Sequence, residues 1–168
     1  MIHLKLTRAV YSAAVSDLHA PHRFCAERIG FIFVRKGTSE GGDLLLLGSR
    51  YVRTADDNYV DDPGVGARID SAAIRGVMQA LLDSQEGGLH VHLHSHRGRP
   101  RFSATDTREL NKLIPCFQNV ATGAVHGAVV LSEDSLSVRL LQPSSPWTTR
   151  GIKVSIIGNP TVVYEQKR

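Results

Sequence analysis

Long hydrophobic runs and cysteines are scarce in this sequence. Among its 168 residues there are only two cysteines, Cys25 and Cys116. A helix that crosses a bilayer needs about 20 apolar residues in a row, and no such run occurs, so we expect no transmembrane helix and no membrane partner. Two cysteines in apolar surroundings favour free thiols over a disulfide-stapled secreted domain. The first residues also lack the apolar segment of a signal peptide, and we therefore expect a cytoplasmic protein.

Blocks of like charge, repeats and low-complexity segments are also missing. The 20 Lys and Arg residues exceed the 16 Asp and Glu residues by four, but they are spread along the chain. Such a balance permits an acidic partner, whereas proteins that bind nucleic acid usually concentrate their basic residues in a patch. We therefore do not expect a nucleic-acid partner. The length and the hydrophobic content of 42% predict a single domain over residues 1–168 with one proper core.

Strand and helix patterns alternate along most of the chain. Apolar runs and alternations predict strands at residues 3–6, 28–36, 43–51, 89–94, 124–131, 136–141, 152–157 and 161–164. Helical spacing predicts three helices, one after Thr7, one capped by Asp70 or Ser71 and stopped by Gly87–Gly88, and one that begins at Ser103. Strands interleaved with helices predict an α/β fold, in which a mixed β-sheet packs against about three helices.

Two histidines and a carboxylate stand out between residues 94 and 106. His94 and His96 continue the alternating strand 89–94, so both side chains are expected on one face. Ser103 with Asp106 three residues later is typical of a helix start, which would hold Asp106 within reach of both imidazoles. A catalytic zinc takes three protein ligands and keeps its fourth position open. The pattern therefore predicts one catalytic Zn²⁺ ion on His94, His96 and Asp106.

This spacing resembles the JAMM family of zinc metalloproteases, also called JAB or MPN+. The family pattern is an early Glu-x-x-Gly, then His-Ser/Thr-His, about seven residues, and Ser-x-x-Asp. The segments 27–30 (Glu-Arg-Ile-Gly), 94–96 (His-Ser-His) and 103–106 (Ser-Ala-Thr-Asp) are similar to it, with six intervening residues. A shifted register that uses His92 and His94 leaves eight residues and loses the His-Ser-His triplet. We therefore prefer the register of His94 and His96.

The resemblance covers roughly residues 1–141 and implies an MPN (cytidine deaminase-like) fold with a hydrolytic site. It implies that Glu27 is the general base and that Ser103 donates a hydrogen bond to the oxyanion. Three arginines that border the site either bind substrate or belong to a plain solvated loop: Arg97, Arg99 and Arg101. Three further histidines have other interpretations: His90 and His92 as packing or ligand-orienting residues, and His126 as a structural residue.

Members of this family cleave the bond after the C-terminal glycine of ubiquitin or a ubiquitin-like protein. As a short chain without an added targeting domain, this sequence is most similar to bacterial JAB peptidases that accompany E1- and E2-like conjugation enzymes, including antiviral ones. The implied partners are a ubiquitin-like protein or its conjugates, and possible E1- or E2-like enzymes. The alternatives are a non-catalytic MPN scaffold, a hydrolase of small-molecule or carrier-protein conjugates or a DNA-associated protein with the same fold, and a cysteine protease that uses Cys25.

Overall fold

The computed structural model describes residues 1–166 as three α-helices, one short 3₁₀ helix and nine β-strands. Strands and helices are interleaved up to residue 120, and only strands follow within residues 1–166. In chain order the elements are β1 (Ile2–Thr7), α1 (Arg8–Leu18), β2 (Ile29–Thr38), β3 (Leu44–Arg53), η1 (Asp56–Asn58), α2 (Ser71–Ser84), β4 (Gly87–Leu93), α3 (Ala104–Val120), β5 (His126–Leu131), β6 (Leu136–Leu141), β7 (Trp147–Thr148), β8 (Ile152–Ile157) and β9 (Val162–Gln166).

All nine strands belong to one mixed sheet in the order β7-β6-β5-β4-β2-β3-β1-β8-β9. Strand β1 runs parallel to β3 and β8, and β4 runs parallel to β5. Three pairs of consecutive strands are antiparallel hairpins: β2–β3, β5–β6 and β8–β9. The prediction of an α/β fold with a mixed sheet and three helices is therefore correct.

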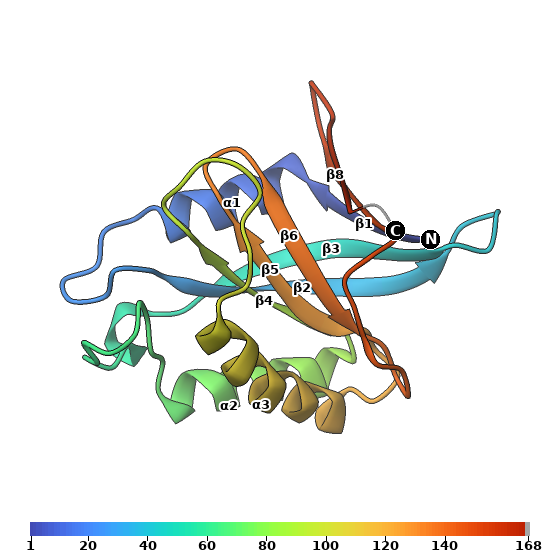
Figure 1. Cartoon of the computed structure of the whole chain (residues 1–168). Helices are drawn as coiled ribbons and strands as arrows, with labels where there is room; N and C mark the ends of the chain where they lie inside the picture. The colour runs from blue at the N-terminus through green and yellow to red at the C-terminus, as the bar shows by residue number, and fades with distance from the viewer. Residues whose placement is uncertain (167–168) are drawn as a thin grey trace.

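The helices cover both faces of the sheet (Figure 1). Helix α1 lies over one face, while α2 and α3 pack side by side on the other. Leu89 and Val91 of β4 belong to the core on the α1 side, whereas Phe31 and Phe117 belong to the core beneath α2 and α3. Because successive residues of a strand point to opposite faces, the even-numbered histidines of β4 face α2 and α3.

A glutamine side chain joins the two ends of the curled sheet. Gln166 of β9 accepts a hydrogen bond from the backbone N–H of Val138 at 2.6 Å through its Oε1 atom. Its amide nitrogen donates to the carbonyl oxygens of Val138 at 3.0 Å and Thr149 at 2.6 Å. Val138 lies in the middle of β6, near the opposite edge of the sheet. The side-chain amide of Gln166 therefore forms the two hydrogen bonds to Val138 that a neighbouring strand would otherwise form.

Two predicted helix starts are confirmed. The hydroxyl of Thr7 accepts a hydrogen bond from the backbone N–H of Val10, and the carboxylate of Asp70 accepts one from Ala73. Both bonds satisfy backbone donors that the first turn of a helix leaves without a partner.

The predicted end of α2 is wrong by a few residues. The helix ends at Ser84, and Gln85 caps it in the left-handed conformation with φ at 53°. The glycine pair at 87–88 instead opens β4, where a Cβ atom on Gly87 would lie 2.0 Å from the carbonyl oxygen of Val125. Glycine is therefore required here by the neighbouring chain and not by the helix end.

No helix within residues 1–166 has the length and apolar character that crossing a membrane requires. The longest of them, α3, contains 17 residues and carries charged side chains on its exposed face, among them Arg108, Glu109 and Lys112.

Candidate metal centre

Two imidazoles converge where β4 ends. His92 belongs to β4 and is only 3% exposed, and His94 follows directly after the strand. Their Nε2 atoms lie 3.2 Å apart. Two ligand atoms on a tetrahedral zinc with bonds of about 2.0–2.1 Å are separated by about 3.3 Å. The two histidines therefore have the spacing of two ligands on one ion.

Asp106 in the first turn of α3 faces both imidazoles. Its Oδ1 atom is 3.5 Å from Nε2 of His92, and its Oδ2 atom is 3.7 Å from Nε2 of His94. The backbone N–H of Ser103 donates to Oδ2 at 2.6 Å, and the hydroxyl oxygen of Ser103 accepts from the backbone N–H of Asp106 at 3.0 Å. This reciprocal pair is the predicted capping box, and it holds the carboxylate toward the histidines.

The electrostatics of the group favour the protonation states that bind a metal. Burial lowers the pKa of His94, and the neighbouring His92 lowers it further, so the His94 ring is neutral at neutral pH. Burial alone would raise the pKa of Asp106, but hydrogen bonds from His92 and Ser103 outweigh it and hold that pKa below its ordinary value. A neutral imidazole and an ionised carboxylate are the forms that coordinate cations.

Glu27 reaches the same group from the segment before β2. Strands β2 and β4 are antiparallel with Ile29 opposite His92, and two more steps of this register bring Glu27 opposite His94. One ligand atom from each of Glu27, His92 and His94 lies within 4.8 Å of the others. The backbone N–H of Glu27 also donates to the carbonyl oxygen of Gly66 at 3.0 Å.

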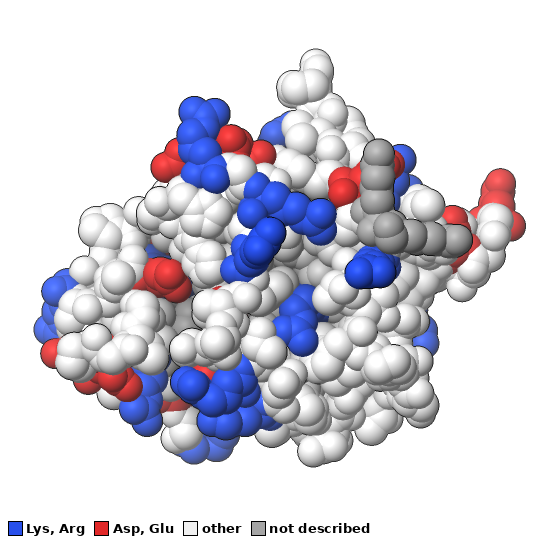
Figure 2. Space-filling view, in the orientation of Figure 1, with Lys and Arg blue, Asp and Glu red and all other residues white. Residues whose placement is uncertain are grey.

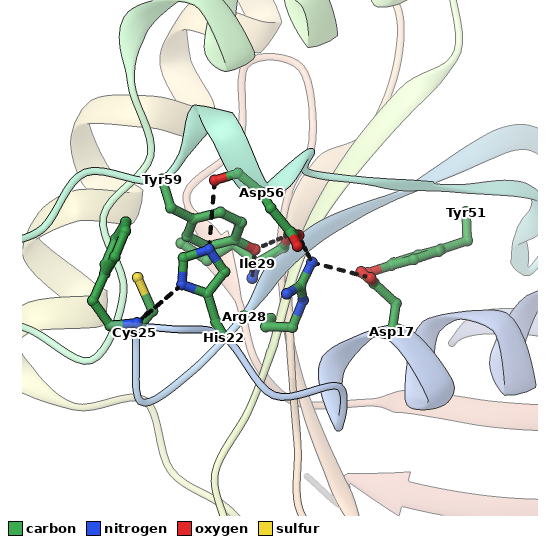
Figure 3. A network of polar contacts seen from close by, with 9 residues as sticks. Asp17, His22, Cys25, Arg28, Ile29, Tyr51, Asp56 and Tyr59 are labelled. Atoms are coloured by element: carbon green, nitrogen blue, oxygen red, sulfur yellow. Dashed lines mark hydrogen bonds and ion pairs between the residues drawn. The ribbon is translucent and has the colours of Figure 1, made fainter.

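A buried polar network fixes the backbone next to Glu27 (Figure 3). The guanidinium of Arg28, 4% exposed, contacts the carboxylates of Asp56 at 2.5 Å and Asp17 at 3.5 Å. The hydroxyl of Tyr59 accepts from the N–H of Ile29 at 2.8 Å and donates to its carbonyl oxygen at 3.1 Å. Helix α1, the 54–70 loop and the start of β2 are thus joined beside the candidate base.

His96 is not among the residues whose ligand atoms lie within 4.8 Å of one another, although its ring centroid is 5.9 Å from that of His94, and the register that includes His96 stays a prediction. Strand β4 ends at Leu93, and the N–H of His96 bonds to the carbonyl oxygen of His94 in a tight turn at 2.8 Å. The turn breaks the alternation on which the prediction depended, because residues 94 and 96 no longer share the face of a strand. His96 is exposed, and its Nδ1 atom contacts the carbonyl oxygen of Arg97 at 2.9 Å. The structure brings His92 to Glu27 and His94 instead.

His92, which our sequence interpretation gave as a packing or ligand-orienting residue, is thus part of the candidate site. The sequence carried one usable signal for His92. With His92 and His94 as ligands, eight residues precede Ser103, and with His94 and His96 six do. Both spacings differ by one residue from the usual seven. The Nδ1 atom of His92 is buried and has no hydrogen-bond partner within residues 1–166.

The three predicted substrate-binding arginines have different surroundings. Arg97 pairs with Asp134 at 3.2 Å, so its charge is already compensated. The Nε atom of Arg99 donates to the hydroxyl of Ser137 at 3.3 Å, and Arg101 is exposed. Neither Arg99 nor Arg101 forms an ion pair with another of the residues 1–166. These two remain available to an external acidic group.

Two further histidines serve the packing of the sheet. His90 lies beneath His92 with its ring 5.7 Å from that of Phe31, and burial lowers its pKa to about 3. His126 is fully buried, accepts a hydrogen bond from the N–H of Gly88 at 3.1 Å and donates to the carbonyl oxygen of Ala121 at 3.0 Å. The second arrangement agrees with the structural role expected of His126.

The cysteine-protease alternative finds no support in the surroundings of Cys25. Cys25 and Cys116 are both free thiols. Burial raises the pKa of Cys25, which disfavours the thiolate that a nucleophile needs. The nearby His22 uses its Nδ1 atom to accept the backbone N–H of Cys25 at 3.3 Å. This imidazole is therefore held as a backbone acceptor and not as a base for the thiol.

Comparison with known proteins leaves this group of residues as the main guide to function. No model of a known protein family matches the chain, and no curated protein matches it. The resemblance to the JAMM family therefore depends on Glu27, the histidine pair and the Ser103–Asp106 capping box.

Proposed function

We propose that this chain is a zinc metallopeptidase of the JAMM type with an MPN fold. One observation carries the proposal: ligand atoms of Glu27, His92 and His94 lie within 4.8 Å of one another, and Asp106 contacts both imidazoles. In the proposed assignment His92, His94 and Asp106 hold the ion. Glu27 is the fourth polar group and is left for proton transfer.

The donor set fits zinc. Imidazole nitrogen and carboxylate oxygen are both common zinc ligands, and a catalytic site uses three of them. Two imidazole nitrogens that face one another beside two carboxylates, in a partly buried group, favour a positive charge between them. A divalent cation supplies that charge more fully than a single proton does. When bound, zinc acts as a Lewis acid and lowers the pKa of a water molecule to about 7.

The residues around the ion have separate roles in the proposed hydrolysis. Glu27 accepts the proton of the attacking water and passes it to the leaving amine, as a general base and then a general acid. The hydroxyl oxygen of Ser103 accepts a hydrogen bond from the backbone N–H of Asp106 and lies beside the candidate ligands. In the proposed mechanism this hydroxyl keeps its proton and donates a hydrogen bond to the oxyanion that develops on the scissile carbonyl.

The proposed substrate is the bond after the C-terminal glycine of a ubiquitin-like protein, either a conjugate or a precursor. A cleft of about 260 Å³ opens beside Glu27 and is lined in part by Pro21, Leu93 and Ser95. A chain that ends in glycine has the narrow cross-section that such a cleft admits. The bacterial conjugation pathway, the cytoplasm and E1- or E2-like partners belong to the same proposal and follow from the family resemblance.

The test is cleavage of a ubiquitin-like precursor encoded near the gene of this chain. The purified protein, with and without a chelator, is incubated with the precursor, and the products are weighed by mass spectrometry. We expect cleavage after the terminal glycine that the chelator abolishes. E27Q should lose cleavage while it keeps its zinc, whereas E40Q, a change in an exposed loop, should behave as the wild type.

Other results would contradict the proposal in distinct ways. Cleavage by E27Q at the wild-type rate would remove Glu27 from the mechanism. A purified protein without stoichiometric zinc would favour the non-catalytic scaffold. Bound zinc with every conjugate and precursor left intact would favour a hydrolase of smaller carrier conjugates.

A further inference from the structure

Arg139 in the middle of β6 is a half-buried cation without an acidic partner. Its guanidinium lies 4.7 Å from the ring centroid of Trp147 and 5.6 Å from that of Phe102. One terminal nitrogen donates to the hydroxyl of Thr107 at 3.1 Å. The Nε atom is buried and has no hydrogen-bond partner within residues 1–166, and Arg139 forms no ion pair in that range.

This surrounding is unfavourable for the charge of Arg139 in the free protein. Burial lowers the pKa of its guanidinium. The two aromatic rings attract a cation but do not neutralise it. Two other guanidinium groups within residues 1–166 are arranged differently: the buried Arg28 contacts two carboxylates, and the partly exposed Arg50 contacts the carboxylate of Glu86. Arg139 has no such carboxylate partner among residues 1–166.

Further arginines extend this surface in one direction. Ser137 and Arg139 are two residues apart on β6 and therefore share a face of the sheet, and Arg99 is held against Ser137. Arg101 follows in the same loop and is exposed. Figure 2 shows Lys and Arg side chains gathered in the middle of this side of the molecule. We call Arg99, Arg139 and Trp147 together the arginine stripe.

The arginine stripe adjoins the candidate metal centre. The ring of Phe102 contacts Arg139 on one side, and its centroid is 6.3 Å from that of His92 on the other. A ligand bound along the arginine stripe would therefore lie next to the reacting groups.

We infer that the arginine stripe binds an acidic segment of the protein substrate, with carboxylates of that segment paired to Arg139 and Arg99. The identification of the partner as the substrate rests on the proposed function. A guanidinium offers a planar edge that binds a carboxylate through two parallel hydrogen bonds. The observations favour an acidic peptide over single-stranded nucleic acid, because Arg139 already covers the ring faces that would stack on bases.

The chain carries its own probe for this site, because Trp147 is its only tryptophan. The full chain is titrated with a short polyglutamate peptide, and separately with a single-stranded oligonucleotide of equal charge, while tryptophan emission is recorded. We expect a saturable change with the peptide that salt weakens. R139Q should weaken peptide binding about tenfold or more, which is the loss of one charge-assisted contact. R75Q, on the exposed face of α2, should bind as the wild type does.

A variant at an exposed arginine keeps the test valid if the substitution of the half-buried Arg139 prevents folding. R99Q alters only a surface side chain and should also weaken binding. Three results would each overturn the inference. They are no saturable change with the peptide, wild-type affinity for the peptide in both R139Q and R99Q, and tighter binding of the oligonucleotide than of the peptide. E27Q separates the two proposals, because it should bind the peptide normally. Cleavage without peptide binding would reject the arginine stripe alone, and peptide binding without cleavage would reject the proposed enzyme alone.

Discussion

Gly66 leaves room for the carboxylate of Glu27. A Cβ atom on Gly66 would lie 2.9 Å from Cδ of Glu27, which is closer than real Cβ contacts come. The atom in the way is the far end of a flexible side chain, so G66A should fold normally and displace only the carboxylate. A displacement of about 1 Å at a catalytic group costs up to about a hundredfold in rate. We expect a tenfold to hundredfold loss of kcat/KM with zinc content unchanged, measured on the precursor.

The matched control is G41A in an exposed loop, where the nearest atom is 4.0 Å from the added carbon. It should keep full activity. A G66A protein that is as active as the wild type would show that the position of Glu27 does not limit the reaction.

Ser103 has two roles that substitution can separate. S103A removes the cap of α3 and the hydroxyl donor together, so we expect about 1 kcal/mol less stability and about a hundredfold lower kcat. S103T keeps the hydroxyl and should restore most of both. Thermal unfolding and initial rates measure the two effects. If S103A loses stability but keeps kcat, the oxyanion role is excluded and only the cap remains.

His126 should make the fold sensitive to mild acid. Burial lowers the pKa of His126 in the folded protein, while the unfolded value is about 6.5. The unfolded chain therefore binds more protons than the folded one as the pH falls below about 6.5, and stability decreases with falling pH. H126Q removes this proton uptake, so its free energy of unfolding should depend less on pH between about 6.5 and 5. Urea unfolding at several pH values, with metal absent, measures the difference. Identical pH profiles would contradict the assignment.

Gln166 should stabilise the curled sheet through its side chain. Q166A leaves the buried N–H and carbonyl groups of Val138 without partners, and each such group costs about 1–3 kcal/mol. We expect an overall loss of about 2–4 kcal/mol in the free energy of unfolding. E165A changes the adjacent exposed side chain and should alter stability by about 0.5 kcal/mol or less. An equally small effect of Q166A would mean that backbone pairing alone holds β9.

The elements that local patterns specify were predictable from the sequence, and the ends of strands were not. The Ser103–Asp106 capping box depends on residues three apart, and the structure contains it as predicted. The end of β4 depends instead on its partners β2 and β5. Paired residues extend only to Leu93, and the chain then turns. Alternation within one segment contains no record of that limit and places His92, His94 and His96 on the same face, so the His-Ser-His triplet of the family pattern decided the prediction in favour of His96.

Long-range packing also explains the roles that the sequence left hidden. Gly87 was interpreted as a helix stop, but the carbonyl oxygen of Val125, far along the chain, is what requires a glycine there. Gly66 and Gln166 act on partners that are 39 and 28 residues away, respectively, Glu27 and Val138. No periodicity or short motif links such pairs, so only the folded arrangement reveals them.

The zinc content of three glutamine variants tests the identity of the metal ligands most directly. H92Q, H94Q and H96Q are purified in parallel, their folding is checked by circular dichroism, and bound zinc is measured by mass spectrometry of the metal. The proposed site predicts that H96Q retains about one zinc ion per chain, because the imidazole of His96 is exposed and its Nδ1 atom contacts the carbonyl oxygen of Arg97. H92Q and H94Q should both lose it. A folded H92Q protein with full zinc, beside an H96Q protein without zinc, would contradict the site described here.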